Sequence, residues 1–185
     1  MARAAHRPLT YDDLLAMPDD GLRHELIDGE HYVTPAPNLK HQTVSLNLTV
    51  ALANFIRAHD TGRLFAAPTD VVFSPTDVVE PDILFVSRER LRLLTDLNIQ
   101  GAPDLVIEIL SPSTRTRDEG IKRRLYERMG VREYWLVDPL LETIHVYCRS
   151  GEALLFVVER TAEDGDLLTT PLLPGLEIPL AEIFS

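Results

Sequence analysis

The stretch PDLVIEILSP, residues 103–112, decides the fold of this chain. On an extended strand, successive side chains point to opposite faces of the sheet. The odd-numbered residues of 105–109 are all apolar, and the even-numbered residues of 106–110 are apolar except Glu108. Apolar residues on both faces indicate a central strand that is covered on both sides.

Glu108 is the exception that this strand must accommodate. A buried carboxylate without a partner costs several kcal/mol. It must therefore pair with another group, bind a metal, stay protonated or reach solvent at the strand's end. The alternative to a functional role is a structural carboxylate that bonds to an arginine or to backbone amides.

The flanking sequence alternates between helical and strand-like patterns. Apolar residues at three- and four-residue steps predict helices, and short β-branched or aromatic runs between turn residues predict strands. A mixed α/β domain around a central sheet follows. The expected elements are a short helix from the Thr10 cap to Pro18, a hairpin over 23–33 with its turn at Asp28-Gly29, a helix over 38–59, strands over 64–73, 78–86 and 105–110, a helix over 114–129, strands over 133–137, 143–147 and 154–158, and an extended rather than helical tail from Leu167.

Composition excludes several classes of protein. The chain has 185 residues, of which 45% are hydrophobic, and it has one cysteine and a net charge of −11. It is too apolar to be disordered, it cannot form an intramolecular disulfide framework, and it has no run long enough to span a membrane. We expect a flexible tail over residues 1–8, one domain over 9–185, and a cytoplasmic location. The charge argues against coating nucleic acid by bulk electrostatics.

Two further features suggest a site around Glu108. The strand-like run 78–86 contains Asp82, and two neighbouring strands that present Asp82 and Glu108 together would form an oxygen-rich site for Mg²⁺. Taken alone, Asp82 is a polar strand end. Residues 115–132 carry seven basic and three acidic side chains, so this stretch is where we expect phosphates to dock, with a solvated helix face as the alternative. Lys122 borders the buried stripe of that helix and can reach toward the carboxylates.

Five motifs follow one another along the chain: ELIDG (25–29), EPDI (80–83), PDLVIEILSPST (103–114), Lys122 with Tyr126, and EYWLVDP (133–139). Their order resembles the Uma family of restriction-endonuclease-like proteins, which is grouped with the PD-(D/E)XK nuclease superfamily. The resemblance covers the chain from about residue 8 to residue 182. It implies a restriction-endonuclease-like core, in which helices flank a central mixed sheet.

The resemblance also implies a catalytic site. Asp82 matches the aspartate of the Pro-Asp motif, and Glu108 matches the acidic residue of the second motif. Together with the backbone carbonyl of Ile109, they would hold Mg²⁺ or Mn²⁺ for hydrolysis of a phosphodiester. The superfamily's usual lysine is replaced by Leu110, and Lys122 on the following helix is its natural substitute.

Other residues receive weaker assignments. Glu25 resembles an acidic residue that many relatives place on an earlier element, where it binds or orients the metal. Arg115, Arg117 and Arg123 are the candidates for contact with substrate phosphate. Tyr126 is a further candidate for substrate contact, with packing as the alternative. We expect His41 to be a capping or core histidine, with a position in the same cleft as the alternative.

Two hypotheses of different classes remain. The first is an active, metal-dependent DNA endonuclease, and the second is a nuclease-fold protein that binds nucleic acid or assembles with partners while its catalysis is weak or lost. Leu110 and the net charge favour the second. The set of Asp82, Glu108 and Lys122 favours the first. A homodimer fits either hypothesis, because cutting both strands requires two sites, but the sequence does not decide it.

Overall fold

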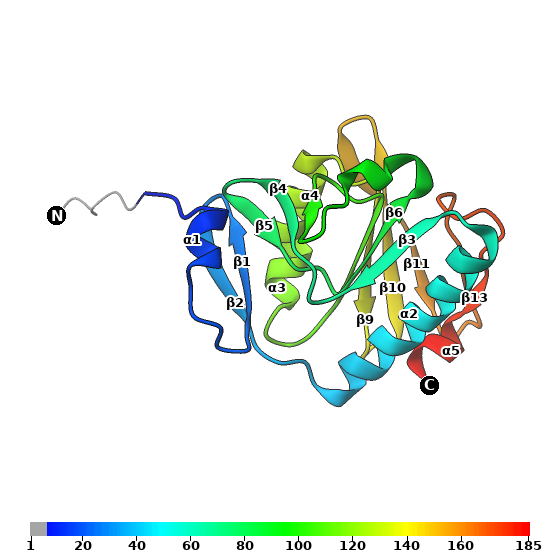
Figure 1. The fold of residues 1–185 in the computed structure, drawn as a ribbon. Coiled ribbons are helices and arrows are strands. Elements are labelled where there is room, and N and C mark those ends of the chain that lie inside the picture. The colour runs from blue at the N-terminus through cyan, green and yellow to red at the C-terminus, as the bar shows by residue number, and fades with distance from the viewer. Residues whose placement is uncertain (1–6) are drawn as a thin grey trace.

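The structure is a computed structural model that describes residues 7–185 (Figure 1). The expected tail therefore lies outside the described residues except for Arg7, which bonds to Asp13 through two nitrogens, and Pro8. The helical elements are α1 (Tyr11–Leu15), α2 (Leu39–His59), η1 (Arg88–Leu93, 3₁₀), α3 (Arg115–Arg117), η2 (Asp118–Lys122, π-helical), α4 (Arg123–Met129) and α5 (Leu180–Phe184). None of the helices formed by residues 7–185 is long and apolar enough to cross a membrane.

Residues 7–185 form thirteen strands in three sheets, and the largest sheet has the order β11-β10-β9-β8-β6-β3. A second sheet has the order β2-β1-β5-β4-β7, and β12 pairs with β13. The pairs β8–β9 and β4–β7 are parallel and the others are antiparallel, so the predicted mixed α/β class is confirmed. The strands are β1 (Arg23–Ile27), β2 (Glu30–Thr34), β3 (Gly62–Ala66), β4 (Val71–Ser74), β5 (Asp77–Val79), β6 (Ile83–Ser87), β7 (Ile99–Gln100), β8 (Leu105–Ile109), β9 (Glu133–Asp138), β10 (Thr143–Ser150), β11 (Ala153–Thr161), β12 (Leu167–Leu168) and β13 (Ile178–Pro179).

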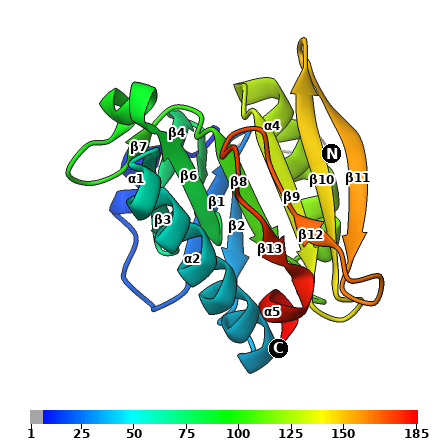
Figure 2. The same cartoon turned by 90° about the vertical axis from the view of Figure 1, so that its right-hand side faces the viewer.

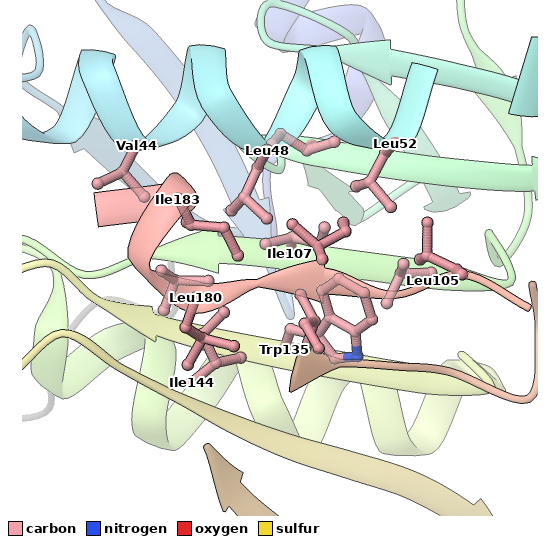
Figure 3. Packing of buried hydrophobic residues seen from close by; sticks show 14 of the residues in the cluster. Val44, Leu48, Leu52, Leu105, Ile107, Trp135, Ile144, Leu180 and Ile183 are labelled. Atoms are coloured by element: carbon pink, nitrogen blue, oxygen red, sulfur yellow. The ribbon is translucent and has the colours of Figure 1, made fainter. Parts of the chain in front are cut away.

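The strand β8 lies inside the large sheet and is buried on both faces, as its sequence predicts. Its odd-numbered residues pack against apolar side chains of α2 and α5, which cover the same face (Figures 2 and 3). Its residue Val106 packs on the other face, against a cluster that includes side chains of α4 and of the second sheet. Glu108 belongs to this second face, between the large sheet, α4 and the hairpin β1–β2.

The local signals near the N-terminus are confirmed. Thr10 and Asp13 form a reciprocal capping box at the start of α1. Asp28 and Gly29 both adopt positive φ, 53° and 74°, in the turn between β1 and β2, as a tight hairpin requires. Asn38 caps α2 by accepting a hydrogen bond from the backbone N–H of His41.

Two predicted strands are each divided by a proline. The run 64–73 separates into β3 and β4 around Pro68, and the run 78–86 separates into β5 and β6 around Pro81. Proline has no N–H to donate to a ladder, and the two halves of each run pair in different sheets. The division leaves Asp82 immediately before β6 rather than inside a strand.

The predicted helix over 114–129 is confirmed as the consecutive helical segments α3, η2 and α4 over residues 115–129, and its π-helical segment η2 carries Asp118 and Lys122. The prediction for the C-terminal tail is wrong in part. The tail from Leu167 is not entirely extended, because α5 forms at its end. Leu180, Ile183 and Phe184 of α5 are buried against the core, so tertiary packing rather than a capping signal stabilises this short helix.

Candidate active site

The pairing of β6 with β8 brings Asp82 and Glu108 to one point. Ile83 lies opposite Ile107 in this antiparallel pair, and extending the register by one residue puts Asp82 opposite Glu108. Residues opposite each other share a face of the sheet. A hydrogen bond fixes this placement, since Asp82 Oδ2 accepts the backbone N–H of Ile109 at 2.8 Å.

Both carboxylates line one cavity of about 190 Å³ between the large sheet, α2, η2 and the end of β2. A second cavity of about 640 Å³ adjoins it. The two share five lining residues, which are Arg23, Pro37, His41, Glu80 and Asp82. Asp82 therefore stands where a small, polar cavity opens into a larger one.

Two neighbouring side chains, Arg23 and His41, stabilise the ionised form of Asp82. Arg23 Nη1 donates to its Oδ1 at 2.8 Å, and His41 Nε2 lies 3.1 Å from its Oδ2. Burial raises the pKa of Asp82, but the His41 hydrogen bond and the charges of His41 and Arg23 outweigh burial and lower it to about 2. The expected capping or core role of His41 is thus incomplete, because its ring faces the cavity and contacts Asp82.

Lys122 lies at the centre of a buried cluster of acids. Its Nζ is 2.7 Å from Glu25 Oε1, 3.0 Å from Glu108 Oε1 and 3.7 Å from Asp118 Oδ1. The π-helical segment η2 presents Asp118 and Lys122 on one side, and π-helical turns are frequent at functional sites. The lysine of this helix therefore reaches Glu108, and strand β1 brings Glu25 to the same point.

The cluster has more negative than positive groups. Burial raises the pKa of Glu108 to about 8, with the charge of Lys122 opposing and that of Asp118 reinforcing the shift. Burial lowers the pKa of Lys122, but the charges of Glu108, Glu25 and Asp118 raise it above its usual range. Tyr126 Oη donates to Glu108 Oε1 at 2.5 Å. Three carboxylates thus surround one lysine, and burial favours the protonated form of Glu108.

The donor set fits a hard divalent cation. Glu25 Oε2 and Asp118 Oδ1 are buried without a hydrogen-bond partner among the described residues. Both hydrogen bonds that Glu108 accepts within residues 7–185 go to Oε1, which leaves Oε2 for a ligand. In the same part of the chain, no three His, Cys, Asp or Glu side chains are arranged to hold a metal ion. The metal ligands expected from the sequence include only two such side chains, Asp82 and Glu108, together with the backbone carbonyl of Ile109.

Of the residues expected to bind substrate, Arg117 alone lines the small cavity. It donates to Thr34 Oγ1 at 2.5 Å, lies over the Tyr32 ring, and its buried Nε has no partner in the described chain.

The other three candidates are directed elsewhere. Arg115 forms ion pairs with Asp138 and with Glu119, which lies one helical turn away. Arg123 lies over the Tyr147 ring. Tyr126 is fully buried, so it contacts Glu108 and neighbouring aromatic rings instead of the cavity. Substrate contact by these three residues is not supported by their positions.

Sequence reasoning missed three polar residues of the site. Arg23 gave no signal, because only the tertiary position of the hairpin brings it to Asp82. Asp118 lies in the charged stretch 115–132, where its sequence context does not distinguish it from residues on a solvated helix face. Glu80 lines both cavities, and burial together with the charges of Asp70 and Glu25 raises its pKa to about 7. Glu80 belongs to the motif EPDI (80–83), and its position next to Pro81 is the sequence feature that could have identified it as a site residue.

The fold of this chain occurs in a solved structure. A crystal structure described as a putative nuclease belonging to DUF820, from Anabaena variabilis, shares it with a TM-score of 0.78. The two chains are 23% identical, and the match covers 96% of this chain and 98% of the other. The likeness shows that the two chains share one mixed α/β fold.

The chain belongs to the Uma2 family, described as "Putative restriction endonuclease", whose model matches residues 11–181. It is also similar to the uncharacterized protein slr1290 of Synechocystis sp., with 27% identity over 146 residues. That match covers 77% of this chain and 74% of the relative. The family resemblance inferred from the five motifs is therefore confirmed.

Proposed function

We propose that this protein is a metal-dependent endonuclease that hydrolyses phosphodiester bonds of DNA. One observation carries the proposal: Asp82, immediately before β6, and Glu108, on the adjacent strand β8, line one cavity, and Lys122 contacts Glu108 there. Burying this many charged groups costs folding free energy. A catalytic role, which apolar residues could not fill, explains why the chain retains them. The membership in a family described as restriction endonucleases supports the same reading.

Asp82, Glu108 and the carbonyl of Ile109 are the groups that would hold Mg²⁺ or Mn²⁺. When bound, such a cation polarises a phosphoryl oxygen and lowers the pKa of a bound water. Glu25 and Asp118 would orient the site through Lys122, since they contact its ammonium rather than the cavity's opening.

The cationic side chains would position the substrate. Arg117 lines the small cavity and has an unpartnered Nε, so it can donate to a phosphate oxygen beside the carboxylates. Lys122 would stabilise the negative charge that develops on the phosphoryl group, because its pKa keeps it protonated. The adjoining larger cavity has room for a nucleotide next to the cleaved bond.

A second function is favoured by a different observation. Both oxygens of Asp82 already accept hydrogen bonds from Arg23, His41 and Ile109, and the net charge of the chain is −11. A protein with this site could bind nucleic acid or act in an assembly with feeble catalysis. In either case, DNA is the proposed partner, a homodimer would supply two sites for two strands, and the proposed location is the cytoplasm.

Calorimetric binding of Mn²⁺ and Mg²⁺ tests the proposal directly, because it does not require knowledge of the DNA that is cut. We expect saturable binding to the wild type that disappears in Glu108→Gln and in Asp82→Asn. The matched control is Glu119→Gln, which changes an exposed glutamate on the neighbouring helical segment and should bind as the wild type does.

Cleavage of supercoiled, single-stranded and branched DNA in Mn²⁺ then separates the two functions. Metal binding with cleavage that Glu108→Gln abolishes supports the endonuclease. Metal binding without cleavage of any of these DNAs supports the binding or assembly protein. Identical heats for the wild type and Glu108→Gln would contradict both the metal site and the hydrolytic proposal.

A further inference from the structure

Two histidines face each other on the hairpin, on the side away from the candidate active site. His24 of β1 lies between Arg23 and Glu25, which both reach the active-site cluster, so strand alternation points His24 to the opposite face. Leu26 pairs with His31 and His24 pairs with Val33, which makes the two histidines diagonal neighbours on that face. The centroids of the two rings are 5.1 Å apart, and the angle between the ring planes is 9°.

The hydrogen bonds fix which nitrogen of each ring carries a proton. Asp20 Oδ1 lies 2.8 Å from His24 Nε2, and a carboxylate can only accept, so His24 Nε2 is the protonated nitrogen. The lone pair of His24 is therefore on Nδ1, which lies 2.8 Å from His31 Nε2. The proton between the two rings then belongs to His31 Nε2.

We propose that His24 Nδ1 and His31 Nε2 form a binding site for a transition-metal cation of the Zn²⁺ or Ni²⁺ type. Imidazole nitrogens bind such ions at about 2.0–2.1 Å, so a tetrahedral pair is separated by about 3.3 Å. The two nitrogens would move apart by about 0.5 Å, and both rings would tilt so that their lone pairs converge on the ion. The proton on His31 moves from Nε2 to Nδ1, so both rings bind as neutral imidazoles and no proton is released.

Asp20 gives the site the arrangement that metal-binding histidines usually have. A carboxylate that accepts the second N–H of a ligating imidazole orients the ring and raises its basicity. His31 is exposed and His24 is half-buried, so an ion can reach the pair from solvent. Water completes the coordination, since in the described part of the chain no third His, Cys, Asp or Glu is arranged to join the pair.

The bound ion would link β1 to β2 across the face opposite the active site. Strand β1 supplies Arg23 to Asp82 and Glu25 to Lys122. The ion would therefore stabilise the strand that positions two active-site side chains, without contacting them. This inference is independent of the proposed hydrolytic function, because it requires the hairpin geometry alone.

Calorimetry of the full chain with Zn²⁺ and Ni²⁺, in excess Mg²⁺ and without an affinity tag, tests the site. The excess Mg²⁺ occupies carboxylate sites and competes poorly for imidazole. We expect one equivalent to bind the wild type, and His24→Gln and His31→Gln to lose this binding. Asp20→Asn should weaken it about 10- to 100-fold, as loss of a carboxylate that orients a ligand does.

The control is His59→Gln, which removes an exposed histidine on α2 and should leave binding unchanged. Thermal unfolding provides a second readout: Zn²⁺ should raise the Tm of the wild type but not of His31→Gln. Circular dichroism without metal verifies that each variant is folded. Absence of saturable binding to the wild type, or equal binding by the wild type and folded His31→Gln, would overturn the proposal.

Discussion

At the scale of single residues, Glu108 is the clearest case of a side chain that reduces stability but serves the proposed function. It is buried beside Asp118 and Glu25 with one lysine among them, and its pKa is raised to about 8. A group whose charged form is disfavoured by folding reduces stability wherever that form predominates. Natural sites commonly retain such groups because a more stable residue would remove the function.

The pH dependence of stability should reveal this conflict in metal-free protein. Glu108 titrates near pH 4.5 when unfolded and near pH 8 when folded, so the folded chain binds the extra proton between these values. The Glu108 contribution to the free energy of unfolding should therefore fall as pH rises from 4.5 to 8. Urea titrations in chelator should show this fall in the wild type and a smaller one in Glu108→Gln.

The stabilities of the wild type and Glu108→Gln can also be compared directly at alkaline pH. We expect metal-free Glu108→Gln to be more stable than the wild type at pH 8. The exposed variant Glu119→Gln should follow the wild type at every pH. A Glu108→Gln protein with the same pH profile as the wild type would show that Glu108 does not titrate in this range.

The sequence identified residues whose type conflicts with their surroundings. Glu108 stood out because a carboxylate interrupted an apolar strand, and Lys122 because it bordered a buried helical stripe. Arg23 and His41 lie in polar, local contexts that fit a hairpin and a helix start equally well. Only the crossing of distant elements brings both to Asp82, and no spacing along the chain encodes that crossing.

At the scale of elements, the apolar pattern predicted where strands form better than where they end. The runs 64–73 and 78–86 both have strand composition, but Pro68 and Pro81 divide them between two sheets. The division matters for function, because the break at Pro81 sets Asp82 at the mouth of the cavity. Likewise, α5 depends on burial against α2 and the sheet rather than on its own sequence.

Two glycines with ordinary negative φ provide a matched test of how tightly the elements pack. A Cβ on Gly62 at the start of β3 would overlap the carbonyl oxygen of Val86 and lie 2.7 Å from the Phe85 ring. A Cβ on Gly120 in η2 would approach nothing closer than Arg124 Nη1, at 3.9 Å. The same substitution should therefore have opposite effects at the two positions.

We expect Gly62→Ala to lower the free energy of unfolding by about 1–3 kcal/mol through overpacking. We expect Gly120→Ala to raise it by about 0.5–1 kcal/mol, since glycine disfavours helix. Urea unfolding of both variants measures the difference. Destabilisation by Gly120→Ala would indicate that the π-helical segment requires glycine for its geometry.

At the scale of the whole molecule, the charge distribution limits how DNA can be held. The chain carries −11 overall, and five of the seven basic side chains in the stretch 115–132 form internal ion pairs: Arg115, Arg117, Lys122, Arg128 and Arg132. Three cationic side chains line the small cavity, and two of them already contact Asp82 or Glu108. Few phosphates can therefore be neutralised at once, so affinity for DNA should depend weakly on monovalent salt.

The salt dependence of binding tests this limit. Each neutralised phosphate contributes about −0.9 on duplex DNA, or about −0.7 on a single strand, to the slope of log K against log salt. With at most three contacts, the slope should be no steeper than about −3. Fluorescence anisotropy of labelled DNA in Ca²⁺, which limits cleavage, measures it between about 50 and 200 mM salt.

Two arginine variants distinguish the cavity from the helix face as the docking surface. Arg117→Gln should reduce the slope by about one, because it removes the one of the three cavity cations that contacts neither Asp82 nor Glu108, although it lies 3.9 Å from Glu25 Oε2. Arg123→Gln should leave the slope unchanged, since that side chain lies over Tyr147 rather than in the cavity. A slope far steeper than −3 that Arg123→Gln reduces would mean that the basic helix face holds the DNA, and that the duplex lies across the surface instead of entering the cleft.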